Sequence, residues 1–264
     1  YKRQDEGEMT TKGDFVAMSE TMMVQNLSMI ADAFVNDAFA CAHRSSPSIV
    51  GFTNVLPCVA GELMNYELSK LGQALENPKR PCIAVLGGIK VDDSVVVADN
   101  MLRGGISDHI WVTGGVANLF LHLSGIDLGE LNVNFLKNEI KEKWDDTVAI
   151  ASALLKDFPE CIIMPSDVAL NITGNRVDHP LKDLPIEAPI FDLGITSIQS
   201  LSKAIKSAGT IILNGPAGVF EVSDFALGTI EMLNACAESE GYAVMGGGHT
   251  ATLVSQRGLA DKMG

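Results

Sequence analysis

The sequence predicts an α/β protein in which a parallel-sheet domain is joined by a long helix to part of a second α/β domain. Two observations carry this prediction. From residue 81 onward, short β-rich segments alternate with amphipathic helical patterns, which is typical of a parallel sheet. Upstream the pattern differs, and a separate helical segment precedes residue 81. We therefore divide the chain into residues 1–56, a connector at 57–80 and a domain at 81–264.

The amino-terminal part contains too few strands to form a domain by itself. Residues 15–34 are predicted to be a helix, residues 35–38 a short strand and residues 42–47 a turn-rich segment. One or two strands bury too little apolar surface for independent stability. Residues 1–56 are therefore interpreted as the remnant of a larger domain.

The connector is predicted to be a helix over residues 57–75. Apolar residues recur at helical spacing, and the pair Asn77-Pro78 marks the end of the pattern. The apolar residues at this spacing are Leu63, Leu68, Leu71 and Leu75.

The domain at 81–264 supplies the parallel sheet. Its predicted strands are residues 83–86, 110–113, 162–164, 210–213 and 243–245. Amphipathic helices are predicted at residues 92–102, 197–207 and 224–237. Ligands of such sheets bind at the carboxyl ends of the strands, so the turns that follow the strands are the candidate binding segments.

Composition narrows the class of protein. With 264 residues, of which 47% are hydrophobic and 20% charged, the chain has the composition of a globular protein. Its apolar runs are far shorter than the roughly 20 residues of a membrane-spanning helix, and its charged start does not resemble a secretion signal. A formal net charge of −14 disfavours nucleic acid as a partner. The five scattered cysteines contain no CxxC pair, which fits a reducing cytoplasm better than a zinc or redox site.

Glycine-rich turns follow several of the predicted strands. Glycine allows the backbone to approach a ligand closely, and N–H groups at a following helix start can hold phosphate oxygens. One such turn is usually only a tight connection, but several on one sheet indicate a nucleotide site. Neither a Walker P-loop sequence nor GxGxxG occurs, so a P-loop NTPase or a standard dinucleotide fold lacks its usual motif. The turns are Leu-Gly-Gly-Ile-Lys at 86–90, Leu-Asn-Gly-Pro-Ala-Gly-Val-Phe-Glu at 213–221, Met-Gly-Gly-Gly-His-Thr at 245–250 and a weaker Thr-Gly-Gly at 113–115.

These turns, with Val-Asn-Asp-Ala-Phe at 35–39 and Ala-His-Arg at 42–44, resemble segments of the phosphoglycerate kinase family in the same order. The resemblance extends to residues 57–81, which are similar to the interdomain helix of that family. It implies a Rossmann-like nucleotide-binding domain at 81–264 and places residues 1–56 in the phosphoglycerate-binding domain. Three segments resemble archaeal members more than bacterial or eukaryotic ones. They are Val-Asp-Asp-Ser at 91–94, Val-Ala-Asn at 116–118 and Gly-His at 248–249.

The resemblance implies a reaction and its ligands. The family transfers a phosphoryl group reversibly from 1,3-bisphosphoglycerate to ADP, giving 3-phosphoglycerate and ATP, with Mg²⁺ on the nucleotide. Such a transfer needs positioning and charge neutralisation rather than a covalent nucleophile. The implied partners are therefore these small molecules, without nucleic acid or membrane, and the oligomeric state is left open.

The resemblance also assigns individual residues. Lys90 matches the family lysine that contacts the phosphates and the transferred group, and Arg44, with His43, matches a segment that reaches the phosphate of the substrate. A guanidinium suits that task because it is always charged and binds bidentately. Lys90 and Arg44 are the candidate catalytic residues. Glu221 matches the carboxylate that binds the ribose, and Asn214 lies near the phosphates in the family.

The remaining candidate nucleotide-binding residues are mostly glycines. The loop and helix start matched to the nucleotide phosphates contain Gly246, Gly247, Gly248, His249 and Thr250. The residues matched to the adenosine pocket are Gly87, Gly88, Gly114, Gly115 and Gly194.

Two positions depart from the bacterial and eukaryotic pattern and fit the archaeal one. Ser94 replaces a second lysine, and His249 replaces an aspartate near the magnesium. Two interpretations of His249 stay open, a phosphate contact and a helix cap, so no metal ligand is assigned. The opening basic segment and the final glycine-rich loop of the family have no counterpart here. We therefore expect a chain truncated at both ends that binds nucleotide with little turnover.

Two other functions stay open. The chain could be a non-catalytic nucleotide-binding module, which turnover of 1,3-bisphosphoglycerate would exclude. A dinucleotide oxidoreductase is disfavoured by the missing motif, and titration with NAD against ADP would separate it.

Overall fold

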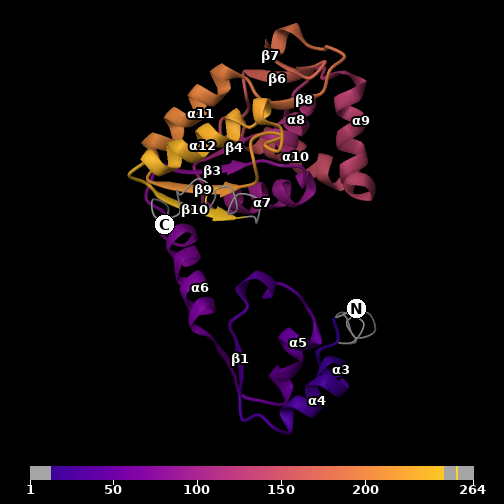
Figure 1. The fold of residues 1–264 in the computed structure, drawn as a ribbon, viewed down its shortest axis with the longest axis vertical. Helices are drawn as coiled ribbons and strands as arrows, with labels where there is room; N and C mark the ends of the chain where they lie inside the picture. The colour runs from indigo at the N-terminus through magenta and orange to yellow at the C-terminus, as the bar shows by residue number, and fades with distance from the viewer. Residues whose placement is uncertain (1–12, 247–253, 255–264) are drawn as a thin grey trace. The chain divides into compact units, whose positions relative to one another are not determined.

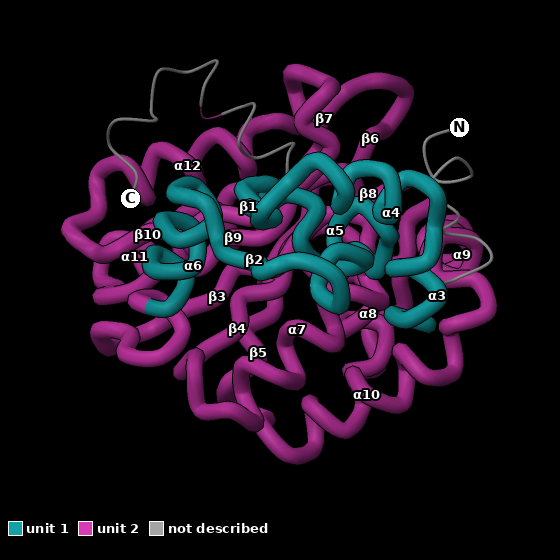
Figure 2. Tube along the Cα trace, turned by 90° about the horizontal axis from the view of Figure 1, so that it is seen from below, with its two compact units in different colours: residues 1–72 teal, residues 73–264 magenta. Residues whose placement is uncertain are grey.

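The computed structural model describes residues 13–246 and residue 254. The chain divides into two compact units, residues 1–72 and residues 73–264, which Figure 2 draws in different colours. The boundary falls inside helix α6 (Glu62–Leu75). The division at residues 56 and 80 stays a prediction, whereas the predicted α/β class is confirmed.

Unit 1 combines short helices with a two-stranded parallel sheet. Strands β1 (Phe34–Asn36) and β2 (Cys58–Ala60) pair with Phe34 opposite Cys58. The ring of Phe34 stacks on Phe52, with centroids 4.6 Å apart, and Met18 and Val24 are fully buried. The helical elements are α3 (Phe15–Ser19), α4 (Met22–Ser28), η1 (Phe39–Cys41), α5 (Pro47–Val50) and η2 (Gly51–Asn54).

The single helix predicted over residues 15–34 is wrong. The structure has two helices, α3 and α4, and Phe34 already belongs to β1. At the break between the helices, the hydroxyl of Thr21 donates a hydrogen bond to the carbonyl of Met18 at 2.9 Å. A side chain that competes in this way for a backbone group favours the end of a helix. The strand predicted at 35–38 is confirmed in kind but ends earlier, because β1 stops at Asn36.

Helix α6 begins after β2 rather than at residue 57 as predicted. The carboxylate of Asp37 accounts for this start, because it accepts a hydrogen bond from the Met64 N–H at 2.9 Å. It thereby satisfies one of the N–H groups that lack partners in the first turn of a helix. Leu63 and Leu68 of the predicted apolar stripe are exposed, whereas Met64 is buried.

Unit 2 is built on a five-stranded sheet whose strands are all parallel, in the order β10-β9-β3-β4-β5 (Figure 1). Strand β3 is buried along its whole length, as expected where helices cover both faces of a parallel sheet. Each strand predicted for this domain is confirmed. They are β3 (Cys82–Leu86), β4 (His109–Val112), β5 (Ile162–Ile163), β9 (Thr210–Asn214) and β10 (Tyr242–Gly246).

Helices cover both faces of this sheet (Figure 1). Alternate residues of β3 point to opposite faces, so Leu86 and Val85 belong to different apolar clusters. The cluster of Leu86 contains α7 (Val91–Arg103), α8 (Gly114–Leu123), α9 (Gly129–Ile140) and α10 (Trp144–Asp157). The cluster of Val85 contains α11 (Ile195–Ser207) and α12 (Leu227–Glu238). The predicted helices correspond to α7, α11 and α12, and none of the helices described is long and apolar enough to cross a membrane.

A second, antiparallel sheet in unit 2 has no counterpart in the sequence prediction. Its strands are β6 (Asp167–Ile172), β7 (Asn175–Pro180) and β8 (Ile190–Leu193), in the order β7-β6-β8. The largely polar β7 is not buried, so it lacks the alternation by which a strand is recognised. Short 3₁₀ turns complete the unit at η3 (Lys141–Lys143), η4 (Leu181–Asp183) and η5 (Ser223–Phe225).

Candidate functional site

The order of the strands creates a switch point between β3 and β9. From β3 the chain continues to β4 and β5 on one side, whereas β9 and β10 lie on the other side. Open parallel sheets bind their ligands at the carboxyl edge beside such a point. Here the two loops are joined by backbone hydrogen bonds, from the Gly87 N–H to the Asn214 carbonyl at 2.8 Å and from the Gly88 N–H to the Pro216 carbonyl at 2.9 Å.

Glycine is required where these two loops touch. Gly215 has a φ of +87°, in the left-handed region that other residues disfavour. A Cβ added to Gly215 would lie 2.7 Å from the carbonyl carbon of Gly87, and one added to Gly87 would overlap the carbonyl oxygen of Pro216. Two stretches of main chain therefore meet at the switch point with no side chain between them.

The start of helix α8 belongs to the same cluster. The N–H of Gly115 donates to the Gly88 carbonyl at 3.0 Å, and the N–H of Thr113 donates to the Leu86 carbonyl at 2.9 Å. Gly114 lies between them, at the first residue of the helix. The structure thus brings the predicted residues Gly114 and Gly115 next to the turn at 87–88, beside a helix start whose N–H groups attract anions.

The segment 214–221 is fixed to two neighbouring elements. The N–H of Ala217 donates to the hydroxyl of Thr229 at 3.0 Å, and this threonine is fully buried at the start of α12. The N–H of Val219 donates to a carbonyl of β8 at 2.7 Å. The main chain is therefore held in place, while the side chain of Glu221 is exposed.

Lys90 lies at the start of α7, directly after the turn at 87–88. It occupies the N-cap position, where its carbonyl accepts a hydrogen bond from the Ser94 N–H at 3.1 Å, and its side chain is exposed. The helix dipole disfavours a cation there, so this position suits an anionic ligand better than a stabilising role. The side chain of Ser94 on the first turn of α7 is buried, with 2% exposure.

Gly194 is the N-cap residue of α11, where the carboxylate of Asp167 accepts hydrogen bonds from N–H groups of the first turn. The N–H groups of Thr196 and Ser197 donate to its carboxylate at 2.9 and 2.8 Å, and the Ser197 hydroxyl donates at 2.5 Å. Burial alone would raise the pKa of Asp167, but these hydrogen bonds outweigh it and hold the pKa below its ordinary value. A Cβ on Gly194 would overlap this carboxylate, so the packing of Asp167 explains why a glycine occupies this position. The predicted contact of Gly194 with the nucleotide stays a prediction.

The other predicted residues are in three places. Gly246 ends β10 opposite the half-buried Asn214 and shares the carboxyl edge with the cluster. His43 and Arg44 are exposed residues of unit 1. Those that lie outside the described residues are Gly247, Gly248, His249 and Thr250.

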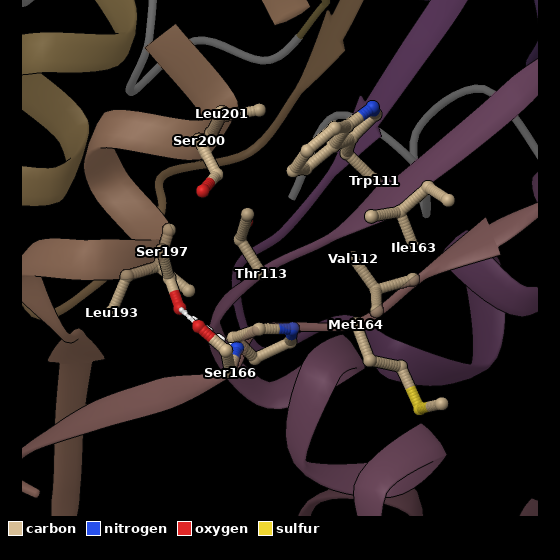
Figure 3. A pocket seen from close by; sticks show the side chains of 11 residues that line it. Trp111, Val112, Thr113, Ile163, Met164, Ser166, Leu193, Ser197, Ser200 and Leu201 are labelled. Atoms are coloured by element: carbon tan, nitrogen blue, oxygen red, sulfur yellow. Dashed lines mark hydrogen bonds between the residues drawn. The ribbon is translucent and has the colours of Figure 1, made fainter. Parts of the chain in front are cut away.

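A cavity of about 260 Å³ lies where β4 and β5 end against α11 (Figure 3). None of the predicted site residues that the structure describes lines it. Its lining combines apolar and hydroxyl side chains without an acid or base, so it can hold a neutral group but supplies no proton-transfer group. No sequence motif marks this cavity, because its walls come from separate segments of the chain. The lining residues are Trp111, Val112, Thr113, Ile163, Met164, Pro165, Ser166, Leu193, Ser197, Ser200 and Leu201.

A cage for a metal ion is absent from the part of the chain that the structure describes. No three His, Cys, Asp or Glu side chains of residues 13–246 lie together in a way that could hold a cation. The metal ligands that the sequence left open therefore stay open.

The chain is similar to phosphoglycerate kinases over almost its whole length. The family model described as phosphoglycerate kinase matches residues 3–264. The phosphoglycerate kinase of Methanothermobacter thermautotrophicus is 45% identical over 256 residues, which are 97% of this chain and 61% of that protein. The one of Methanobacterium bryantii is 47% identical over 249 residues, or 94% and 60% of the two chains. The crystal structure of phosphoglycerate kinase from Pyrococcus horikoshii matches with a TM-score of 0.85 and 37% identity, covering 96% of this chain and 62% of that one. The chain thus spans about three fifths of these relatives, and its resemblance to archaeal members is confirmed.

Proposed function

Because the chain belongs to the phosphoglycerate kinase family, we propose that the full-length protein transfers a phosphoryl group reversibly from 1,3-bisphosphoglycerate to ADP. The observation that carries this proposal is the contact of the loops that follow β3, β4 and β9 at the switch point of the sheet. The main chain there can approach a ligand without intervening side chains, and it lies at the start of α8, where the helix dipole favours an anion. Such a site suits a nucleotide.

Each residue of the site has a task in this proposal. Lys90 compensates the negative charge of the phosphates, most of all while the phosphoryl group is in transit. Glu221 accepts hydrogen bonds from the ribose, and the glycines at 87–88 and 114–115 border the adenosine. Mg²⁺ arrives on the nucleotide and neutralises phosphate charge, which fits its preference for phosphates over an all-protein cage.

Unit 1 supplies the phosphoglycerate side. Arg44, with His43, binds the phosphate of the substrate, because a guanidinium keeps its charge and can form two parallel hydrogen bonds. Transfer requires donor and acceptor to be held in line, and such positioning is worth roughly 7–11 kcal/mol of the barrier. Residues 1–264 span about three fifths of the length of the relatives, so we expect them to hold donor and acceptor less precisely and to turn over slowly. A chain extended to the length of its relatives is expected to turn over fast.

The compartment proposed for the reaction is the cytoplasm. All five cysteines are free thiols, which is the usual state in a reducing compartment.

Calorimetry tests the nucleotide site first. Residues 1–264 should bind MgADP, and Glu221→Ala should weaken the binding by about tenfold or more, because hydrogen bonds to a charged group are worth roughly 1.5–3 kcal/mol. Glu160→Ala is the matched control, since Glu160 is also exposed but precedes β5 at the opposite edge of the sheet. Tighter binding of NAD than of ADP would contradict the proposed class.

Turnover tests the reaction itself. The extended chain should convert 1,3-bisphosphoglycerate and ADP, and Lys90→Ala should lower its kcat far more than its affinity for nucleotide. An extended chain that binds ADP without turnover would be a non-catalytic nucleotide-binding module, and the proposal would be wrong.

A further inference from the structure

The segment that carries Glu221 lies close to one buried carboxylate at both ends and is hydrogen-bonded to it at one of them. The side chain of Asp192 on β8 has no exposed surface and accepts a hydrogen bond from the Gly228 N–H at 2.8 Å. A Cβ added to Gly218 would lie 2.5 Å from the Oδ1 of Asp192, and one added to Gly228 would overlap the same atom. Asp192 therefore lies between the first and the last residue of the segment 218–228.

Arg176 on β7 binds both this carboxylate and the middle of the segment. Its Nη1 donates to the Oδ2 of Asp192 at 2.7 Å and to the carbonyl of Asp224 at 3.2 Å. Its Nη2 donates to the carbonyl of Leu193 at 2.6 Å and to the carboxylate of Asp178 at 3.0 Å. A planar guanidinium can serve these acceptors together, whereas a lysine ammonium has no such fork.

The ion pair is buried, so each partner depends on the other. The side chain of Arg176 is 13% exposed. Burial raises the pKa of Asp192 above its ordinary value, and the contacts from Gly228 and Arg176 oppose this rise. Removal of one partner would leave a buried charge uncompensated. The ring of Phe225 in this segment is fully buried and packs edge-on against the ring of Phe191, with the ring centroids 5.1 Å apart.

We infer that Arg176 is a positioning residue for the nucleotide: through Asp192 and the carbonyl of Asp224, it sets the place of Glu221 relative to the ribose. The inference rests on the proposed function, because it takes the ribose contact of Glu221 from there. Arg176 touches no nucleotide in this scheme and acts only through the segment 218–228. Its loss therefore reduces recognition of the ribose hydroxyls more than affinity for the phosphates.

A pair of ligands measures this effect directly. Calorimetry of residues 1–264 with MgADP and with the Mg²⁺ complex of 2′,3′-dideoxy-ADP should show that the wild type prefers ADP by roughly tenfold or more. In Arg176→Met the preference should fall below about threefold, since Glu221 is no longer held. Arg103→Met is the matched control. Arg103 also binds two carboxylates, Asp99 and Asp157, but these contacts join α7 to α10 and do not involve the segment 218–228. A full preference for ADP in Arg176→Met would overturn the inference.

Hydrogen exchange provides a second reading that needs no nucleotide. Arg176→Lys keeps the positive charge beside Asp192, so it should stay folded even if Arg176→Met does not. The amides of Val219 and Gly228 should exchange about tenfold faster in Arg176→Lys than in the wild type, and should not change in Arg103→Met. Unchanged exchange at both amides would overturn the inference. A wild-type chain that binds no ADP would instead refute the proposed function, and the exchange rates would still decide whether Arg176 fixes the segment.

Discussion

Replacement of Gly215 by alanine tests the close contact on which the site depends. A Cβ at this position would overlap the carbonyl oxygen of Gly87 and would lie 2.7 Å from its carbonyl carbon. Residue 215 also has a φ of +87°, and a left-handed backbone costs a residue with a side chain roughly 1–2 kcal/mol. The overlap is with main chain, so the loops must separate and strain two backbone hydrogen bonds worth about 1–3 kcal/mol together. Gly215→Ala should therefore destabilise unit 2 by about 2–5 kcal/mol and weaken ADP binding.

Gly125→Ala is the control for backbone strain without overlap. Gly125 has a φ of +92°, and a Cβ added there would have no atom within 4 Å. It should cost only the roughly 1–2 kcal/mol of strain and leave ADP affinity unchanged. Urea denaturation gives both free energies of unfolding, and calorimetry gives the affinities. If the two variants are equally destabilised and bind ADP equally well, the contact between the loops does not shape the site.

Three further predictions concern the surroundings of the site. Thr229→Val keeps the shape of a fully buried side chain but leaves the Ala217 N–H without its hydrogen-bond acceptor. Thermal unfolding should therefore show that the free energy of unfolding falls by about 1–3 kcal/mol. A fall of less than about 0.5 kcal/mol would contradict this prediction. The pKa of Asp167 is lowered from 3.8, so its carboxylate stabilises the fold above that pH and loses this effect as the pH falls further. In urea titrations the free energy of unfolding of the wild type should exceed that of Asp167→Asn by a constant amount from about pH 7 to 5, and this difference should shrink at lower pH. A difference that grows on acidification would contradict the prediction. Ser200→Phe narrows the cavity beside α11 and should leave ADP affinity unchanged, whereas a large loss in calorimetry would place the nucleotide in that cavity.

The strands of the parallel sheet could be predicted because each is a short β-rich run, and all but β5 are followed by a glycine-bearing turn. The same signal led to the glycines at 87–88 and 114–115, which the structure brings together. The antiparallel sheet was missed because β7 carries polar and half-buried residues in no clear alternation. The break at Thr21 was missed because a single hydroxyl bound to the carbonyl of Met18 has no strong pattern in the sequence.

Supporting residues of the site could not be predicted in the same way. Arg176 and Asp192 are isolated charged residues of different strands, and neither lies in a recognisable motif. Their importance comes from burial and from contacts with the segment 218–228. Such contacts depend on the three-dimensional fold, so periodicity and spacing along one chain do not reveal them.

We propose that a nucleotide binds at the switch point between β3 and β9. Amide NMR spectra of residues 1–264 titrated with MgADP test this claim, because the amides of each loop are observed separately in one experiment. We expect the largest shift changes at Gly88, Gly115 and Val219, and little change at Trp111 beside the cavity. Saturating changes confined to Trp111 and its neighbours, or no changes at any of these amides, would contradict the claim.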